Sequence, residues 1–562
     1  MVRFVGTRRV GGGAHLIVAL ALLVAAPLSS AAPFPEARPT TRGDAVAALC
    51  PGAEDAGPCV RARLFEIGAD SRVGPPALRR ATAILGRGAA LAEERVFRGP
   101  DDLRIRYTTA DGGFDRTDPA DGSGNAVPDV VEGVALGAWQ ARGLLLRQLE
   151  LPRPPVSELV LVELGDRLDG YVIPSAAGFS LVLDSTPIDG AEGARRAAIR
   201  LYAYAVARGS STGFPVRWAE AIAAWATLSI DGAPDAATTR DLSLRVQTLD
   251  AGLDPTDPRS GAGNALWLAF LEDAYGLGAV RATIEELGRL AQTEPALDRA
   301  LRRSSTDDLR AAFREFHLWA VLVGDRADLR HLPFASRLDS PTFATRAEGL
   351  PAIAIREASP VAPLGASHVL LVPGESRGGL HVRFEGDFLA TWEADLLLVA
   401  ETGALRRVPL SVGPEGRSDV TVPVHGVHEA LLLVRNLDSV DGAPHRYSIT
   451  AFHEPHFPFE LATLDASRVE DGTGGVLVTW ETVGEQSLVG FNVVRADVDS
   501  GLEVVVNPVW IPALGGRAEP AAYRFLDRGA DRERTYAYRI EGITNEGIAA
   551  ASRSVLGPRP TP

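Results

Sequence analysis

The 562-residue chain contains no lysine, and its only methionine is Met1. The absence of lysine excludes Schiff-base chemistry and a lysine general base. The net charge of -15 has the wrong sign for a nucleic-acid binder, which needs a basic face opposite the phosphates. The apolar fraction of 46% is typical of a globular chain, and no apolar run long enough to span a bilayer follows the N-terminal region. We therefore expect neither a nucleic-acid partner nor a polytopic membrane protein.

Histidine is scarce where catalysis would need it. After His15, the next histidine in the chain is His317. The region between them therefore lacks the imidazole of a Ser-His-Asp triad and the imidazoles of a histidine-ligated zinc site. A hydrolase that uses two carboxylates stays open, because Asp and Glu together number 72, although no spacing selects a pair.

The N-terminus has the pattern of an export signal. Basic residues within the first nine positions precede an apolar stretch over 16–28, and small residues over 29–32 form a cleavage region. We expect residues 1–32 to be a signal peptide, so that the mature chain has no transmembrane segment and is periplasmic, at the cell surface or extracellular. An uncleaved N-terminal anchor is the alternative.

Cysteine is almost absent as well. Cys50 and Cys59 are the only two in the chain, and they flank a short loop that contains proline and glycine. In an exported protein, two such cysteines are expected to form a disulfide. A catalytic or metal-binding thiol is the alternative, but no histidine lies nearby in the sequence.

The chain is long enough for several domains. After the signal peptide, residues 33–100 form an N-terminal segment with the cysteine loop and a helix, and residues 101–335 mix strands with a run of helices. Residues 340–456 and 460–562 each contain short alternating apolar runs separated by Gly, Pro and Asp, which is typical of β-sandwiches. The fold class we expect is multidomain: an α+β domain followed by two all-β sandwich domains, the first of them jelly-roll-like. Helices are expected at 76–95, 128–149, 194–208, 215–229, 263–274, 277–291 and 305–323.

An acidic, glycine-containing loop over 114–133 groups several side chains with oxygen donors. Calcium takes six to eight oxygen ligands and accepts them from a flexible loop. We therefore predict a calcium site here, although the spacing is not that of an EF-hand. The alternative is a solvated loop in which Asp129 begins a helix with a favourable dipole charge. The candidate ligands are Asp115, Asp118, Asp121, Asn125, Asp129 and Glu132.

Three segments, in this order, resemble a group of secreted bacterial metallopeptidases of the zincin type. RIRYTT at 104–109 is similar to a strand of that group, and DGSGNAVPDVVEGV at 121–134 is similar to its following loop and helix. ARRAAIRLYAYAVARG and RWAEAIAAWATLSI, at 194–209 and 217–230, resemble its pair of metal-binding helices. The resemblance covers about residues 60–330 and implies a zincin-like α+β domain.

The metal-binding motif of that group is degenerate in this chain. In the family the first helix carries H-E-x-x-H and the second a glutamate. Here Arg200 stands where the first histidine would be, Leu201 replaces the glutamate that activates water, and Tyr204 replaces the second histidine, while Glu220 keeps the third ligand position. Arginine is a permanent cation and leucine accepts no proton. The resemblance therefore implies a scaffold without zinc, in which Arg200 pairs with Glu220 unless Glu220 faces solvent.

The last 100 residues resemble fibronectin type III modules. VTWET, GFNVVR, YRFLDRG and TYAYRIEGITNEG carry the likeness, and they place Trp480, Phe491, Tyr536 and Tyr538 in the core. The function we expect is that of an exported pseudopeptidase that binds an extracellular protein or a glycan. The alternative is an active secreted hydrolase, either a metallopeptidase with atypical ligands or a carbohydrate-active enzyme with paired carboxylates.

Overall fold

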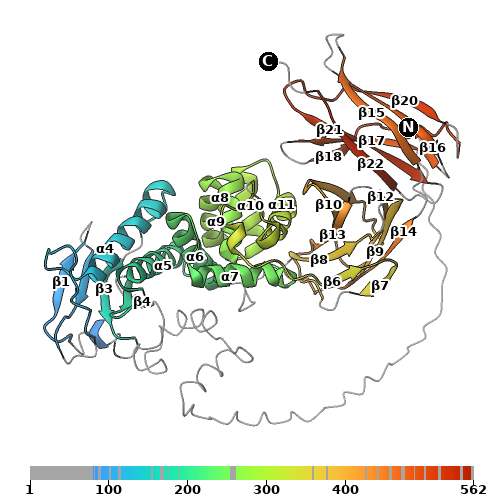
Figure 1. Cartoon of the computed structure of the whole chain (residues 1–562). Helices are drawn as coiled ribbons and strands as arrows, with labels where there is room; N and C mark the ends of the chain where they lie inside the picture. Colours follow the sequence, from blue (N-terminus) through green and yellow to red (C-terminus); the bar gives the residue numbers. More distant parts are fainter. Residues whose placement is uncertain are drawn as a thin grey trace, which may run out of the picture. The chain divides into compact units, whose positions relative to one another are not determined.

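The chain contains helices and several β-sheets, and its organisation is multidomain, with sandwich sheets predominating (Figure 1). The expected signal peptide and both cysteines lie outside the residues that the structure describes, so they stay predictions. Of the helix expected over 76–95, residues 80 and 83–85 are helical, whereas residues 90–94 are not and β1 begins at Arg95, so the helix was predicted too long at its end. The other residues of that range lie outside the described ones. Within the described residues, no helix combines the length and the apolar character needed to cross a membrane. The computed structural model describes residues 80, 83–85, 90–99, 103–111, 115–153, 156–164, 170–175, 178–187, 189–253, 261–328, 330–356, 360–374, 378–424, 427–439, 442–454, 459–469, 475–485, 488–498, 502–516, 520–544 and 549–558.

The first sheet is mixed, with strand order β1-β2-β3-β5-β4. Its inner strands β2, β3 and β5 are parallel, and the edge strands β1 and β4 pair antiparallel with β2 and β5. The strands predicted near 103–107, 157–164 and 179–183 are confirmed. β4 was not predicted, because a sequence with Gly170 and Pro174 resembles a turn. The bounds are β1 Arg95–Arg98, β2 Arg104–Tyr107, β3 Val156–Val162, β4 Gly170–Ser175 and β5 Gly178–Asp184.

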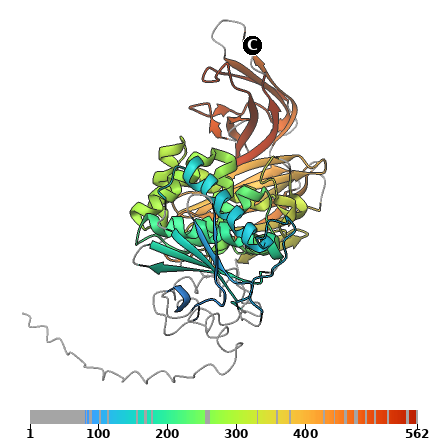
Figure 2. The same cartoon turned by 90° about the vertical axis from the view of Figure 1, so that its left-hand side faces the viewer.

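α4 lies between β2 and β3 in the chain, the later helices follow β5, and helices cover one face of the first sheet (Figure 2). Six of the predicted helices are confirmed in outline. α7 was not predicted because its apolar stripe is weak, and α10 was not predicted because its buried stripe is narrow within a very polar sequence. α4 ends in a short π-helix over Gly143–Gln148. The bounds are α4 Asp129–Arg142, α5 Gly190–Ser210, α6 Val216–Asp231, α7 Ala236–Gln247, α8 Ala265–Tyr275, α9 Leu277–Leu290, α10 Thr293–Ser304 and α11 Leu309–Val321.

Two glycines let α4 and α5 pack backbone to backbone. A Cβ atom on Gly133 would lie 2.2 Å from the carbonyl oxygen of Ala191, and one on Gly137 would lie 2.1 Å from that of Arg195. Real Cβ atoms do not approach a carbonyl so closely, so only glycine permits this contact. The two positions lie one turn apart on α4, in a Gly-x-x-x-Gly pattern. They fix the position of α5, the helix that carries the degenerate motif.

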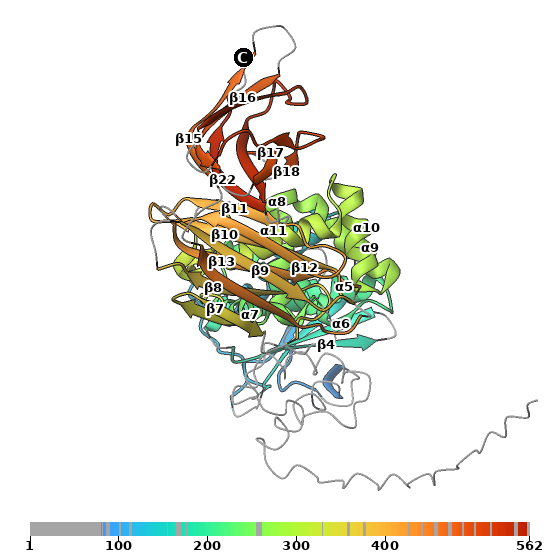
Figure 3. The ribbon, with the colours of Figure 1, turned by 90° about the vertical axis from the view of Figure 1, so that its right-hand side faces the viewer.

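The middle region is a sandwich of two sheets, with orders β11-β10-β13-β8-β6 and β12-β9-β14-β7 (Figure 3). The runs SHVLLV, LHVRFE, ADLLLVA, LRRVPLSV, SDVTVPV, EALLLVR and RYSITAF predict seven strands, and all seven are confirmed as β8 to β14. The bounds are β6 Thr345–Glu348, β7 Ala352–Arg356, β8 Gly365–Val372, β9 Gly379–Gly386, β10 Trp392–Ala400, β11 Leu405–Leu410, β12 Arg417–Pro423, β13 Val427–Asn436 and β14 Tyr447–Glu454.

The C-terminal region has a three-stranded sheet, β15-β16-β20, opposite the strands β18-β17-β21-β22. The predicted core aromatics Trp480, Phe491, Tyr536 and Tyr538 are all buried, together with Tyr523. The two sandwiches are linked along one edge, because β22 pairs parallel with β12. The bounds are β15 Phe459–Arg468, β16 Val476–Glu485, β17 Leu488–Asp497, β18 Glu503–Val505, β19 Ile511–Pro512, β20 Ala521–Asp527, β21 Tyr536–Thr544 and β22 Ala549–Leu556.

Candidate functional site

Two of the degenerate motif positions lie in the hydrophobic core. Leu201 and Tyr204 are 1% and 3% exposed, within a core cluster that joins α4, α5 and α6 to the first sheet. Leu201 packs onto β4, since a Cβ atom on Gly170 would lie 2.7 Å from its Cδ1. The position that would hold the water-activating glutamate is therefore filled by an aliphatic side chain that contacts the sheet.

Arg200 has an acidic partner that the sequence did not indicate. Its guanidinium forms an ion pair with Asp235 and a hydrogen bond of 3.3 Å to the hydroxyl of Thr238. Asp235 is the N-cap of α7, where its carboxylate accepts the backbone N–H of Thr238 at 2.7 Å. Burial of Asp235 opposes its ionisation, but Arg200 and Thr238 together hold its pKa below the ordinary value. The Asp235 carboxylate therefore caps α7 and at the same time neutralises the charge of Arg200 on α5.

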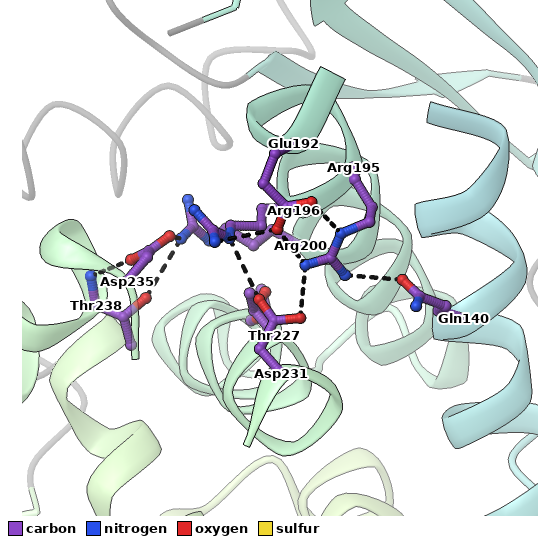
Figure 4. Close-up of polar contacts among 10 residues, drawn as sticks. Gln140, Glu192, Arg195, Arg196, Arg200, Thr227, Asp231, Asp235 and Thr238 are labelled. Carbon is purple, nitrogen blue, oxygen red and sulfur yellow. Dashed lines mark hydrogen bonds and ion pairs between the residues drawn. The ribbon is translucent and has the colours of Figure 1, made fainter. Parts of the chain in front are cut away.

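Two neighbouring arginines on α5 form a connected network (Figure 4). Arg195 donates to Glu192 at 2.7 Å, to Asp231 at 2.7 Å and to Gln140 of α4 at 2.8 Å. Arg196 contacts Asp231 at 3.3 Å and Glu192 at 3.0 Å. Hydrogen bonds from Arg195 to the two carboxylates raise its pKa, so it is charged at every relevant pH. Hereafter the arginine cluster means Arg195, Arg196 and Arg200 with Glu192, Asp231 and Asp235.

The arginine cluster balances charge among four helices. It contains three guanidiniums and three carboxylates, drawn from α5, the end of α6 and the N-cap of α7, and it reaches α4 through Gln140. Partly buried charges are stable only when paired and hydrogen-bonded. The arrangement holds the helices together. Its guanidiniums cannot serve as metal ligands, since a guanidinium has no lone pair to donate.

The register of the two helices separates Glu220 from Arg200. α5 and α6 pack together through a short connection, and Arg195 and Arg196 both reach Asp231 at the end of α6. If α5 and α6 are aligned antiparallel from these contacts, Arg200 of α5 lies opposite about residue 227 of α6. Glu220 lies about two turns, or roughly 10 Å, from that point toward the start of α6. Glu220 is 7% exposed, and its Oε2 lies 2.3 Å from where a Cβ atom on Gly261 would be. The register therefore favours Asp235 over Glu220 as the carboxylate for Arg200.

The acidic loop is organised by backbone donors. One oxygen of Asp121 accepts the N–H groups of Gly124 and Asn125 and the hydroxyl of Ser123, and the other accepts the N–H of Ala126 at 2.7 Å. Desolvation is the largest single effect and raises the pKa of Asp121, but these hydrogen bonds together hold the pKa below its ordinary value. The Asp121 carboxylate is therefore the acceptor that organises the backbone of this loop.

The other candidate ligands have different partners. Asp129 accepts the N–H of Gly122 at 2.9 Å, and Asp118 accepts the N–H of Ala120 at 3.0 Å. Asp115 is paired with Arg80 at 2.6 Å, and Asn125 donates to Glu132 at 2.5 Å. Within the part of the chain that the structure describes, no group of three or more His, Cys, Asp or Glu side chains is placed to hold a metal ion. The calcium site stays a prediction, and the hydrogen bonds explain the loop without it.

A second charged cluster was not predicted at all. Asp395 of β10 is 3% exposed and is paired with Arg435 of β13 and with Arg407 of β11, the latter at 2.7 Å. Arg407 also reaches Glu315 of α11 at 2.6 Å. A charged residue inside an apolar strand run, as in ADLLLVA and LLLVRN, was the available signal.

His317 of α11 lies beside that cluster and is fully buried. Neither of its ring nitrogens has a hydrogen-bond partner among the described residues, and its ring centroid lies 5.9 Å from that of His368 on β8. Burial, followed by the positive charge of Arg435, lowers the pKa of His317 well below its ordinary value. His317 is therefore neutral and serves as a packing residue between α11 and the sheet.

Comparisons with known proteins place the chain in no family. No family model matches it, and no curated protein matches it. An Fn3-like protein from Clostridium thermocellum is 17% identical over 18% of this chain and 94% of its own length, with a TM-score of 0.13. A beta-1,2-glucanase from Parabacteroides distasonis is 10% identical over 37% of this chain and 30% of its own length, with a TM-score of 0.12. A glycosyl hydrolase family 2 member from Bacteroides cellulosilyticus is 9% identical over 34% of this chain and 26% of its own length, with a TM-score of 0.15. The chain thus spans a third or less of both hydrolases, and scores this low establish no common fold.

Proposed function

We propose that this chain is an exported multidomain protein whose helical domain keeps a metallopeptidase-like scaffold without its metal chemistry, and that the protein acts by binding at the cell surface or beyond. One observation carries the proposal. Arg200, at a position where the resembled family has a zinc ligand, is held by Asp235 and Thr238 in a charge-balanced cluster. At this position the side chains join α5 to α7.

The order of the elements supports the scaffold. A strand, β2, leads into the acidic loop and α4, and three further strands, β3 to β5, precede the helix pair α5 and α6. The resembled segments therefore form a strand, a loop with a helix and a packed helix pair, and α4 and α5 are in close contact through Gly133 and Gly137.

The chemistry of the motif positions supports the loss of catalysis. A zincin needs two imidazoles on one helix face and a carboxylate beside the metal-bound water. At those positions this chain has a guanidinium that repels a cation, an aliphatic side chain packed on β4, and a buried phenol. Glu220 alone would leave the metal with a single protein ligand of the usual set, which is too few to hold it.

The C-terminal region supports a binding or spacer role. Its three-stranded sheet opposes a second sheet over an aromatic core, as in fibronectin type III modules. Tyr536, at the start of β21, accepts the backbone N–H of Asp531 through its hydroxyl at 3.3 Å. A tyrosine at this corner that bonds a few residues upstream is a feature of such sandwiches. We propose a fibronectin type III-like module on this basis.

Metal analysis of the purified chain, combined with a protease assay, tests the proposal. We expect less than stoichiometric zinc after dialysis and no proteolysis that a chelator abolishes. Glu220→Gln serves as the internal control, because in a working metallopeptidase it would remove both zinc and activity, whereas here it would change neither. Stoichiometric zinc that is lost in Glu220→Gln would refute the proposal and support the alternative of an active hydrolase with atypical ligands.

A further inference from the structure

A polar pocket lies at one end of the middle sandwich, apart from the arginine cluster. Its volume is about 870 Å³, within the usual range for small-molecule sites. It is formed where β9 ends and where β12 and β14 begin, together with the loops that precede β10 and β12. The residues used below are Glu385, Phe388, Glu415, Arg417, Arg446 and Ser448.

The loop at the rim of this pocket is held in one conformation. The carboxylate of Asp387 accepts the N–H of Leu389 at 3.1 Å and contacts His445 at 2.9 Å. The Asp387 carbonyl accepts the indole N–H of Trp392 at 2.9 Å, and its own N–H donates to the carbonyl of Arg446 at 3.1 Å. The loop therefore does not need to be ordered when a ligand binds, which lowers the entropic cost of binding.

The rim presents an apolar ring that the fold does not bury. Phe388 is 71% exposed, although the loop on both sides of it is bonded to the sandwich. The loop that carries Glu415 is tied to the same end of β9, because the N–H of Gly386 donates to the carbonyl of Gly416 at 2.8 Å. An aromatic face beside fixed polar groups fits a ligand that is apolar on one face and polar at its edges.

The charges in the pocket identify the class of ligand. Glu385, Asp387 and Glu415 accept hydrogen bonds, Arg417 and Arg446 donate them, and Ser448 does both. A simple anion would be repelled by the three carboxylates, and a simple cation by the two guanidiniums. An uncharged polyol satisfies both kinds of group, because each hydroxyl donates and accepts.

We propose that this pocket binds a neutral saccharide, with a pyranose ring stacked on Phe388 and its hydroxyls bonded to the carboxylates and guanidiniums. Arg417 and Glu385 already lie side by side at 3.8 Å, so a donor and an acceptor are available to vicinal hydroxyls. The proposal does not depend on whether the helical domain is catalytic, since every residue named belongs to the middle sandwich.

Affinity electrophoresis of the purified chain tests it, in native gels that contain xylan, galactomannan, dextran or hydroxyethyl cellulose. We expect at least one of these neutral polysaccharides to retard the protein. Phe388→Ala should weaken the retardation about fivefold or more, through loss of the stacking face. Arg417→Ala should weaken it about tenfold, through loss of a charged hydrogen-bond donor.

Two control variants match these changes. Leu389→Ala removes an equally exposed apolar side chain (69%) from the same loop without lining the pocket, and Arg524→Ala removes an exposed arginine from β20. Both should be retarded like the unmodified chain, and melting curves should show that all four variants fold. Three results would overturn the proposal: no retardation in any of the four gels, equal weakening by the controls, or binding only to dextran sulfate or unfolded casein, which would identify a polyanion or a peptide as the ligand.

Discussion

The guanidinium of Arg200 and the carboxylate of Asp235 join the middle of one helix to the first turn of another, 35 residues later in the chain. Both side chains are 14% exposed, so the ion pair is largely shielded from solvent. Arg200→Ala should therefore lower stability by about 1–3 kcal/mol, because Asp235 would keep its burial and lose its cation. Urea unfolding followed by tryptophan fluorescence measures the shift. Arg302→Ala, which breaks a pair between Arg302 (62% exposed) and Asp298, is the control and should lower stability much less. Equal shifts for both variants would mean that the Arg200 pair contributes no more than a surface pair.

The same pair should show energetic coupling. Asp235→Ala removes the cap of α7 as well as the partner of Arg200, so alone it should cost more than Arg200→Ala. In the double variant the uncompensated charge disappears, and the total loss should be smaller than the sum of the two single losses by about 1 kcal/mol or more. Additive losses in a double-mutant cycle would show that the two side chains do not interact in solution.

Stability should fall on acidification because of two buried histidines. Burial, followed by the charge of Arg326, lowers the pKa of His368 to about 4, and burial and Arg435 lower that of His317. Both folded-state values lie below the unfolded value of about 6.5, so the unfolded chain binds protons first as the pH falls. The stability is complete above about pH 6.5 and is lost toward pH 4, by about 3 kcal/mol for His368.

Urea midpoints at neutral and mildly acidic pH test this dependence. His368→Leu should flatten the loss of stability between these two conditions, because the titrating group is removed. The exposed His428 on β13 offers the control, and His428→Gln should leave the slope unchanged. If His368→Leu retains the slope of the unmodified chain, other groups account for the acid sensitivity.

Asp121 should stabilise the acidic loop without a bound ion. Asp121→Ala removes the acceptor for three backbone N–H groups and a hydroxyl, so its melting temperature should fall by the same amount with and without calcium. Asp118→Ala, which removes the acceptor for one N–H group, should have a smaller effect. If calcium raises the melting temperature of the unmodified chain and leaves that of Asp121→Ala unchanged, the predicted calcium site is real.

The contact between α4 and α5 predicts opposite effects for two glycine substitutions. In Gly137→Ala the new methyl group would overlap the carbonyl oxygen of Arg195, and the helices would have to separate, at a cost of about 2 kcal/mol or more. Gly143→Ala adds a methyl group with no neighbour within 4 Å at a helical backbone position, so it should raise stability by about 0.5–1 kcal/mol. Thermal melts of the two variants should therefore shift in opposite directions, and a shift of the same sign would show that the helix packing differs from that described.

The sequence indicated elements more reliably than contacts. The strands of the two sandwiches were predictable because alternating apolar residues, such as those around Trp480 and Phe491, have the period of a half-buried strand. β4 was missed because Gly170 and Pro174 suggest a turn, although Gly170 is required where β4 packs against Leu201. Of the two missed helices, α7 has a weak apolar stripe, and α10 has a clear but narrow stripe within a very polar sequence.

The candidate site was predictable in position but not in its partners. The resemblance placed Arg200, Leu201 and Tyr204 on one helix, and this is where the structure has them. It suggested Glu220 as the partner of Arg200 because a metal site would bring those positions together. The register set by Asp231, together with the later turn that carries Asp235, depends on how the helices pack, which no local pattern encodes.

The balanced charges around α5 have a consequence for how the domain folds. A fold that relied on a captured ion would mature only where that ion was supplied, and it would be lost to any chelating competitor. Here the same attachment is made by side chains translated with the rest of the polypeptide. The joint between α5, α6 and α7 should therefore form equally well in metal-poor surroundings.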